Sequence, residues 1–457
     1  MFGAVHFHFQ FSSRMKPKTD LWNFEYSANF NILYYLGIWQ IESGDAKKDY
    51  AHLIYRHVCF VALFTAIALQ LIDFWMAIGD VDRMTYNLCT STITTGSFFH
   101  FILQLTHSNE LNELRRRLWL DFYMYDEEED MAIKQQIFKE MKFISRLFHL
   151  AAIFFYPVCM LQGYFSYLWG PREFPFPAFM PFHLDSDSQY IGPFLVELII
   201  GVIVLFGTID SNLLVFGLSL QLVTLYKLLQ KDLGKLNEVD YDEGNVKGEY
   251  KEINYVLRRI KMEQSIKELI SRLTTLTGYV NTFRSCMTAP SVLPFICGFI
   301  LMITNGVQVI QMSYAFNYRL IYEMVYLVLI FVDLFYFCYY ITMLNSEVSE
   351  LVQVELSVKQ KRCSPDESRL FFFLFEILNV ADAAYFSGWY KLDVKFQKYI
   401  LLMMLQAQRA PRFSAGKLVS INLNTYLLLL KHTYSSLMLF RQLDTSQKAV
   451  QNAAMMS

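Results

Sequence analysis

The chain has 457 residues, of which 54% are hydrophobic and 18% are charged, and its formal net charge is −2. This composition is typical of a membrane protein and excludes an ordinary soluble globular protein of this length. The basic residues are interleaved with acidic ones, which excludes the basic face that a nucleic-acid-binding protein needs.

Seven apolar stretches are each long enough for a membrane helix, which needs ~20 mostly apolar residues. In chain order they are 55–78, 85–106, 147–169, 193–226, 277–314, 320–344 and 418–440. The fourth and fifth stretches are longer than a bilayer requires. This excess predicts either strong tilt or helices that continue into the cytoplasm. The fifth stretch also contains Pro290 and Pro294.

Lys and Arg are unevenly distributed among the pieces that separate these stretches. Four pieces are rich in Lys and Arg. The piece that ends at Arg56 has 6 of these residues, 107–146 has 7, 227–276 has 10 and 346–417 has 10. The pieces near 79–84, 171–192 and 315–320 carry one each. Short cytoplasmic loops retain Lys and Arg, while exported loops lack them. The pattern therefore predicts a cytoplasmic N-terminus and an extracellular C-terminus.

Two of the cytoplasmic pieces have the pattern of packed helices. Residues 246–275 place apolar side chains at helical spacing among charges. Residues 366–409 hold two short apolar cores, with charges between and within them. Charges at a bilayer centre are costly, so we expect cytoplasmic helices here. If either core spanned the membrane instead, the helix count would be eight and the C-terminus would lie inside.

The predicted fold is an all-α membrane protein of seven transmembrane helices with a cytoplasmic helical anchor domain. Its expected parts are a cytoplasmic region 1–54, helices one to four in 55–226, a cytoplasmic extension 227–276, helices five and six in 277–344, anchor helices in 345–417, helix seven in 418–443 and an extracellular tail 444–457.

Motifs of enzymes and metal sites are missing from the sequence: no Walker loop, no G-x-S-x-G, no H-E-x-x-H and no Cys pair at zinc spacing. We therefore expect no enzymatic activity, no cofactor and no metal. None of the 7 cysteines falls in a predicted outer loop, so no disulfide framework is expected. Ionisable residues are rare within membrane spans. We expect the deeper two, Asp210 and Asp333, to make structural contacts inside the bundle or to lie in the cytoplasmic extension, rather than to bind substrate.

The outer loop 171–192 is rich in Pro and Phe. Proline fixes φ and lacks a donor, so this loop either caps a cavity or rests on the outer leaflet. The neighbouring spans combine aromatic, small and hydroxyl side chains, which suits a volatile or lipophilic ligand. The residues that we predict to line a pocket for such a ligand are Thr90, Thr94, Phe98, Gly163, Tyr164, Tyr167, Tyr322 and Tyr326.

Three segments of the sequence resemble the insect odorant receptor family. The outer loop FPFPAFMPF resembles the family's second extracellular loop. The stretch 381–417 resembles its segment before the last helix, with Tyr385, Trp389, Gln408, Arg409, Pro411, Ala415 and Gly416 as landmarks. The ending LLLLKHTYSSLMLFRQL resembles its pore helix. Together with length, helix count and orientation, the resemblance covers nearly the whole chain.

The resemblance implies an odorant-gated, non-selective cation channel in the plasma membrane of olfactory neurons. It implies a heterotetramer with a co-receptor, a volatile ligand and contact with lipid, but no nucleic acid. The loop after helix four is shorter here than in the co-receptor, so the chain resembles a ligand-tuned subunit. The family's gate lies near the C-terminus, and alignment of the Gln442–Leu443 pair carries that role to Leu439 and Leu443.

Helix seven has the pattern that a pore helix needs. Leu439 and Leu443 are four residues apart, and Ser436 continues their stripe. A ring of leucines can close a pore by dewetting, and Gln442 offers a polar contact to hydrated cations. Leu437 and Phe440 remain alternative gate residues, and Lys431 is expected to face away from the pore.

Two other receptor classes stay open at this point. Gustatory receptors share the topology and usually end in a Gln-Phe pattern, whereas this chain has Arg441-Gln442-Leu443. A G-protein-coupled receptor would need an intracellular C-terminus, and its usual outer-loop disulfide is excluded because loop 171–192 has no cysteine.

Overall fold

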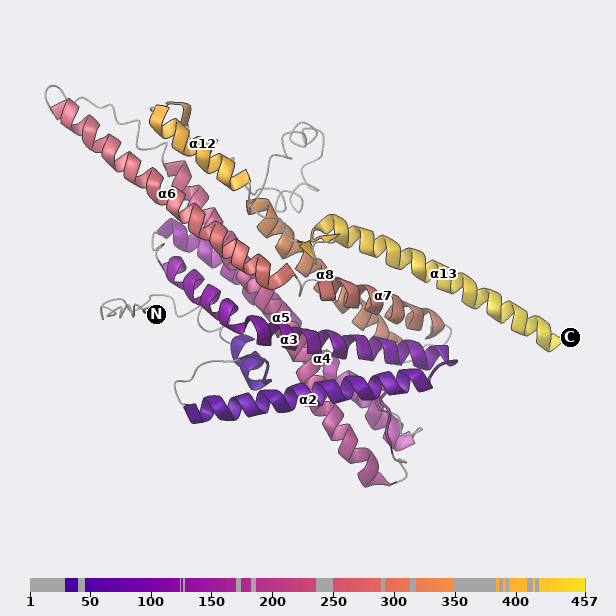
Figure 1. Cartoon of the computed structure of the whole chain (residues 1–457). Coiled ribbons are helices and arrows are strands. Elements are labelled where there is room, and N and C mark those ends of the chain that lie inside the picture. The colour runs from indigo at the N-terminus through magenta and orange to yellow at the C-terminus, as the bar shows by residue number, and fades with distance from the viewer. Residues whose placement is uncertain are drawn as a thin grey trace, which may run out of the picture.

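The structure is a computed structural model in which almost every described residue is helical (Figure 1). It describes residues 29–39, 46–123, 125, 128–169, 174–181, 186–235, 250–288, 292–312, 318–348, 384–385, 389–391, 394–408, 414–415 and 419–456. Within these ranges the strands are β1 (Ser414–Ala415) and β2 (Val419–Ser420). They pair antiparallel, with Ser414 opposite Ser420.

The long helices follow one another with short connections. Their bounds are α2 (Ala46–Met76), α3 (Val81–Tyr123), α4 (Glu128–Trp169), α5 (Asp187–Lys235), α6 (Tyr250–Thr288), α7 (Val292–Met312), α8 (Tyr318–Val348), α12 (Val394–Gln408) and α13 (Leu423–Met456). A single 3₁₀ turn, η3 (Trp389–Lys391), precedes α12. The prediction of an all-α membrane fold is confirmed, and most predicted spans fall within one of these helices.

The fifth predicted span, 277–314, is wrong as a single helix. The structure divides it between α6, which continues the amphipathic 246–275 segment, and α7. Proline cannot donate the backbone hydrogen bond that a helix interior requires. Pro294 lies in the first turn of α7, where backbone N–H groups have no intrahelical acceptor. The proline pair therefore marks a helix start that span length alone concealed.

Helix α5 is the centre of the bundle. It packs against α2, α3, α4, α6 and α8. Every residue from Asp210 to Tyr226 is buried, which explains why apolar side chains occur on all sides of this stretch rather than on one face. Its 49 residues correspond to ~74 Å of helix, more than twice the ~30 Å hydrocarbon core. The excess length of the predicted fourth span is therefore real.

Helices α6 and α12 form a pair at one end of the molecule, as Figure 1 shows. The buried side chains of α12 include Phe396, Ile400, Met403 and Met404, and Lys395 Nζ donates to Glu263 Oε1 of α6 at 2.9 Å. The second apolar core expected within 366–409 is thus a packed helix of 15 residues. The first core, 371–378, lies outside the described residues.

Helix α13 lies on the flank of the bundle and contacts α7 and α8 (Figure 1). It begins shortly after β2 and continues to Met456, well past the predicted end of helix seven at 443. Asn422 caps it, because Asn422 Oδ1 accepts from the backbone N–H of Thr425 at 2.8 Å.

Four described helices are long and apolar enough to cross a membrane. They are Ala46–Met76, Asp130–Leu161, Asp187–Lys235 and Leu320–Leu344, and Phe295–Gln311 is a shorter apolar helix. Helices α3 and α13 are long enough but contain more polar residues than these four helices. Both nevertheless pack alongside the apolar helices. The chain is a multi-pass membrane protein.

Candidate ligand pocket and pore helix

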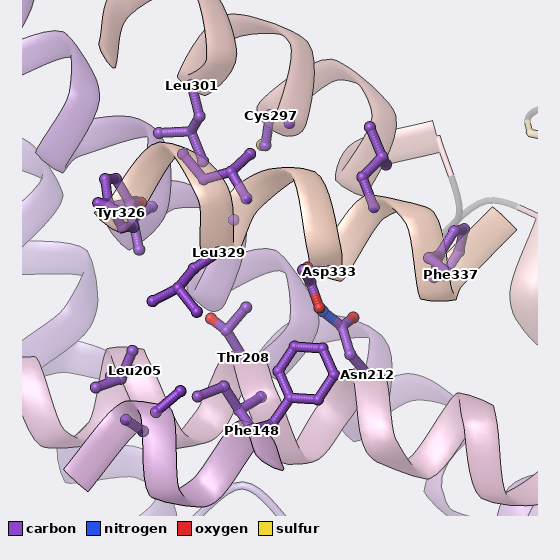
Figure 2. A pocket seen from close by; sticks show the side chains of 18 of the residues that line it. Phe148, Leu205, Thr208, Asn212, Cys297, Leu301, Tyr326, Leu329, Asp333 and Phe337 are labelled. Carbon is purple, nitrogen blue, oxygen red and sulfur yellow. The ribbon is translucent and has the colours of Figure 1, made fainter. Parts of the chain in front are cut away.

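A cavity of about 160 Å³ lies among α3, α4, α5, α7 and α8 (Figure 2). Helix α8 contributes one continuous face to it: Tyr326, Leu329, Ile330, Asp333, Leu334 and Phe337. Their spacing of three and four residues is that of one side of a helix. Opposite them lie apolar and small residues of α4, α5 and α7, such as Phe148, Leu205 and Gly298. An apolar cavity with few polar groups suits a small lipophilic ligand.

An aromatic stack borders one end of this cavity. Phe155 of α4 stacks on Tyr322 at 4.6 Å and on Tyr326 at 5.4 Å, measured between ring centroids. Tyr322 Oη also donates to Cys159 Sγ at 3.3 Å. Offset aromatic contacts of this kind stabilise the packing of α4 against α8. A ligand here would meet ring faces at one end.

A carboxylate and an amide provide the main polar pair of the cavity (Figure 2). The amide nitrogen of Asn212 on α5 donates to both carboxylate oxygens of Asp333 on α8, at 3.1 and 3.0 Å. The hydroxyl of Thr208, which also lines the cavity, donates to the carbonyl of Val204 at 2.8 Å. The threonine is therefore satisfied within its own helix, while the Asn212–Asp333 pair joins two helices.

The eight residues predicted for the pocket lie in several places. Tyr326 lines the cavity and Tyr322 lies behind it in the aromatic stack. Thr90 and Thr94 are buried and donate to carbonyls of their own helix, and Phe98 packs against Phe60 of α2.

The other three predicted pocket residues belong to α4. Gly163 contacts the outer loop, Tyr167 stacks on Tyr190, and Tyr164 is half exposed. Asn212, Thr208 and Asp333 line the cavity but were missing from the predicted set. The i, i+3, i+4, i+7 spacing from Tyr326 to Asp333 was the signal that could have identified the aspartate.

The described part of the outer loop, 174–181, is held by protein groups. Tyr86 Oη donates to the carbonyl of Pro175 at 2.7 Å, and Asn87 Nδ2 donates to that of Pro177 at 3.2 Å. The backbone N–H of Phe179 donates to the carbonyl of Leu69 at 3.1 Å. These bonds fix the loop to α2 and α3. None of the described loop residues lines the cavity.

Helix α7 contacts both the cavity and α13. Its first half contributes Cys297, Gly298 and Leu301 to the cavity. Two turns later, a Cβ placed on Gly306 would lie 2.6 Å from Leu437 Cδ2 of α13. The absence of a side chain at Gly306 therefore permits this close approach.

The predicted gate residues lie on the opposite side of α13 from α7. Successive helical residues are about 100° apart, so Leu439 lies about 160° from Leu437. Leu439 and Leu443 are 58% and 53% exposed, and Gln442 is exposed as well. Ser436 is half-buried at the border of this face. Leu437, an alternative gate residue, is instead used in packing against Gly306.

The deeper ionisable residues of the spans make the structural contacts that were expected. Asp210 Oδ1 lies 3.1 Å from His149 Nε2 of α4, and Asp333 pairs with Asn212. Nearer the helix ends, Arg83 Nη2 lies 2.5 Å from Asp73 Oδ1, and Asn305 Nδ2 donates to Glu323 Oε2 at 2.5 Å. Buried polar groups of this kind require partners. Only Asp333 among these carboxylates also borders the cavity.

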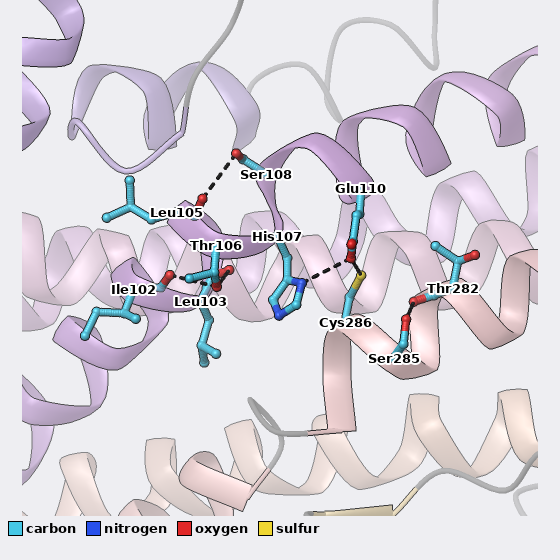
Figure 3. A network of polar contacts seen from close by, with 10 residues as sticks. All are labelled: Ile102, Leu103, Leu105, Thr106, His107, Ser108, Glu110, Thr282, Ser285 and Cys286. Atoms are coloured by element: carbon cyan, nitrogen blue, oxygen red, sulfur yellow. Dashed lines mark hydrogen bonds and ion pairs between the residues drawn. The ribbon is translucent and has the colours of Figure 1, made fainter. Parts of the chain in front are cut away.

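A separate polar cluster joins α3 to α6 (Figure 3). His107, Glu110 and Cys286 have ligand-type atoms within 4.8 Å of one another. Glu110 Oε2 accepts from Cys286 Sγ and contacts His107 Nδ1, both at 3.1 Å. The sequence spacing gave no sign of this cluster, because Cys286 lies 176 residues from Glu110. The three groups satisfy one another as an interhelix contact.

Comparison with known proteins gives a consistent result. The family model described as 7tm Odorant receptor matches residues 80–355 and 373–434. Odorant receptor 49a of Drosophila melanogaster is 39% identical over 64 residues, which are 14% of this chain and 16% of that relative's length. The chain thus spans a small part of the curated relative that it matches.

Two solved structures share the fold over nearly their full length. One is the insect olfactory receptor OR5 from Machilis hrabei in complex with eugenol, with a TM-score of 0.71 and 13% identity. That match covers 93% of this chain and 100% of the other. A second structure of OR5 matches with a TM-score of 0.68 and 12% identity, over 91% and 97% of the two chains.

Proposed function

The chain belongs to the 7tm odorant receptor family, and on this premise we propose that it is a ligand-tuned subunit of an odorant-gated, non-selective cation channel. The ligand is a volatile small molecule, and the partner is a co-receptor subunit in a heterotetramer. The family is one of receptors rather than enzymes. The proposed location is the plasma membrane of olfactory sensory neurons, with the N-terminus inside and the C-terminus outside.

One observation carries this proposal: α7 contacts both the cavity and α13. Leu301 of α7 lines the cavity, and Gly306 of the same helix lies against Leu437. A ligand that rearranges the packing around Leu301 changes the position of a helix that holds α13 directly. Packed helices transmit such shifts because their interfaces are not continuously deformable. Ligand occupancy and the position of α13 are therefore linked.

The exposed face of α13 supports the role of a pore helix. Leu428, Leu439 and Leu443 share this face and are each more than half exposed. A stripe of apolar side chains on a membrane protein contacts either lipid or another subunit. In the proposed channel the stripes of four subunits face one another. Leu439 and Leu443 then form the closed gate by dewetting, with Ser436 and Gln442 as polar neighbours.

The paired helices α6 and α12 support assembly through a cytoplasmic anchor. Ile260 of α6 and Leu402 of α12 are 56% and 60% exposed, although the opposite face of α12 is buried. Charged residues occur on the same two helices, including Glu263, Lys267 and Lys395. Exposed apolar side chains interspersed with charged ones on a helix pair are compatible with a subunit contact. We propose that 227–276 and 345–417 together make this anchor.

The odorant pocket in this proposal is the cavity of Figure 2. Tyr326 contacts the ligand directly, and Tyr322 supports it through the aromatic stack. Gly163 and Tyr167 act indirectly, because they position the outer loop and α5. Four of the predicted pocket residues do not line this cavity and act by shaping the helices around it: Thr90, Thr94, Phe98 and Tyr164.

The decisive experiment is a current measurement in cells that express this chain with a co-receptor. Odorants from a broad volatile panel are expected to evoke a cation current that needs both subunits and no G protein. Surface delivery is checked with a C-terminal tag on unpermeabilised cells, which also tests the orientation. Silence across the panel in cells with both subunits at the surface would count against the channel function.

A further inference from the structure

We propose that the cavity selects ligands whose polar group donates a hydrogen bond, that is, alcohols and phenols over ethers of the same shape. The acceptor is the carboxylate of Asp333, which the amide nitrogen of Asn212 holds in place. This inference rests on the proposed function in one respect: it takes the cavity among α3, α4, α5, α7 and α8 as the ligand site.

The orientation of the Asn212 amide is set by its partner. An ionised carboxylate only accepts hydrogen bonds, so the amide must present its nitrogen to Asp333. The observed distances of 3.1 and 3.0 Å to the two oxygens fit this arrangement. The amide oxygen then points elsewhere. It is buried and has no hydrogen-bond partner among the residues that the structure describes, and Asn212 as a whole is only 3% exposed.

The carboxylate of Asp333 also has unused accepting capacity. Its two oxygens offer about four lone-pair sites. Within the described part of the chain, Asn212 is the one donor to them. Asp333 keeps part of its surface accessible although it lies inside the bundle, because it borders the cavity. A donor brought by a ligand can therefore reach it.

The other hydroxyls near this pair do not donate to the oxygens of Asn212 or Asp333. Thr208 donates to the carbonyl of Val204, and Thr92 donates to that of Leu88 at 2.6 Å. His100 lines the cavity from α3, and no hydrogen bond joins it to Asp333 among the described contacts. The cavity thus combines an excess of accepting oxygens with an apolar wall. An ether or ester oxygen placed there would face like partial charges.

The position of Asp333 along α8 gives the ligand a direction. Tyr326 lies seven residues before Asp333, which corresponds to ~10 Å along the helix axis. Leu329 and Ile330 fill the interval on the same face. A molecule of this length can donate its hydroxyl hydrogen to Asp333 while its apolar end meets Tyr326 (Figure 2), which stacks on Phe155.

The test compares isomeric pairs of volatiles, in which one member has a hydroxyl donor and the other is an ether with the same number of heavy atoms. Suitable pairs are 2-phenylethanol against benzyl methyl ether, 4-ethylphenol against 4-methylanisole and 1-hexanol against 1-methoxypentane. The receptor with its co-receptor is expected to respond to at least one alcohol or phenol at concentrations about tenfold or more below its ether, since a hydrogen bond to a charged or buried acceptor contributes that much. Equal or better responses to the ethers would overturn the inference.

Two variants assign the preference to the proposed atoms. Asp333→Leu removes the carboxylate, and the double variant Asn212→Leu/Asp333→Leu removes both polar groups, so that no unpaired amide is left buried. In each, the ratio of ether to alcohol concentrations for half-maximal response is expected to fall to about one. Asp82→Leu, an exposed aspartate on α3, is the matched control and keeps the ratio. A ratio that persists in both cavity variants would refute the assignment.

A binding measurement separates this inference from the channel function. The thermal stability of the purified receptor is recorded with each alcohol and with its ether. Larger stabilisation by the alcohols, lost in the double variant, supports the inference even where no current is seen, and the channel function then falls alone. Equal stabilisation by both members of every pair overturns the inference, whatever currents are recorded.

Discussion

Gly306 of α7 and Leu437 of α13 are in such close contact that a Cβ on the glycine would lie 2.6 and 2.7 Å from the two methyl carbons of the leucine. This contact joins the helix that borders the ligand cavity to the helix proposed to line the pore. A side chain at Gly306 would therefore force the side chain of Leu437 to move.

Gly306→Ala is therefore expected to change gating. Overpacking a close contact costs ~1–3 kcal/mol, and a shift of that size between closed and open states changes the half-maximal odorant concentration about fivefold or more. Dose–response curves in cells with equal surface expression provide the measurement. Leu437→Ala in the same chain makes room for the new methyl group and should restore the response. An unchanged curve for Gly306→Ala would show that α7 does not couple the cavity to α13.

Polar substitution of the proposed gate should open the channel without odorant. Leu439→Ser and Leu443→Ser replace the apolar ring by hydroxyls, which lowers the cost of wetting the constriction. The expected result is a basal current several times that of the unmodified channel, read as leak conductance in the absence of ligand. Leu427→Ser is the control, since Leu427 is 60% exposed on a different face of α13. Equal leak in the control would argue against a gate at 439 and 443.

Two glycines, Gly163 of α4 and Gly278 of α6, should respond oppositely to alanine. A Cβ on Gly163 would lie 2.7 Å from ring atoms of Pro175 and 2.8 Å from Phe194, and the proline cannot move away easily. Gly163→Ala is thus expected to lower stability by ~1–3 kcal/mol. A Cβ on Gly278 meets nothing within 4 Å, so Gly278→Ala should be neutral or stabilising by ~0.5–1 kcal/mol. Melting temperatures of the purified variants test both, and a stable Gly163→Ala protein would contradict the close packing of the outer loop.

The contact between α6 and α12 should persist over a wide pH range. Hydrogen bonds from Lys267 and Lys395 lower the pKa of Glu263 to about 2. A lowered folded-state pKa means that the stabilisation is complete above the unfolded value of ~4.3 and is lost as the pH falls towards 2. The backbone amides of α12 are therefore expected to be equally protected from hydrogen exchange at pH 7 and pH 5, and less protected below pH ~4. The exchange rates are corrected for the intrinsic rate at each pH.

The same contact can be tested by substitution at neutral pH. Lys395→Met removes the bond to Glu263 and should speed exchange in α12 modestly, by less than about fivefold, because exposed ion pairs contribute little. Lys398→Met makes the same change three residues later on the same helix and leaves Glu263 with both of its partners. Equal effects of the two variants would show that the Glu263–Lys395 bond does not hold α12.

Much of the architecture follows from the sequence because a membrane imposes simple constraints. Apolar stretches of ~20 residues must be helices, since their backbone polar groups have no water to bind. The stretches around α2, α4, α5 and α8 were therefore identifiable, as was the excess length of α5. The division of 277–314 into α6 and α7 was missed because both parts are apolar. Only the two prolines indicated that a single helix could not cover them.

The sequence by itself determined the helical membrane fold, the outward stripe of Leu439 and Leu443, and the family to which the chain is similar. The helices and their apolar stripes depend on residues that are close in sequence, so the helical periodicity of 3.6 residues reveals them. The tertiary structure alone decided which face of each helix meets which partner. It brought Asn212 to Asp333 across 121 residues of sequence, placed Leu437 on Gly306, and left Thr90 and Phe98 outside the cavity. Contacts between helices depend on their crossing and rotation, and the spacing of residues along one chain does not contain that information.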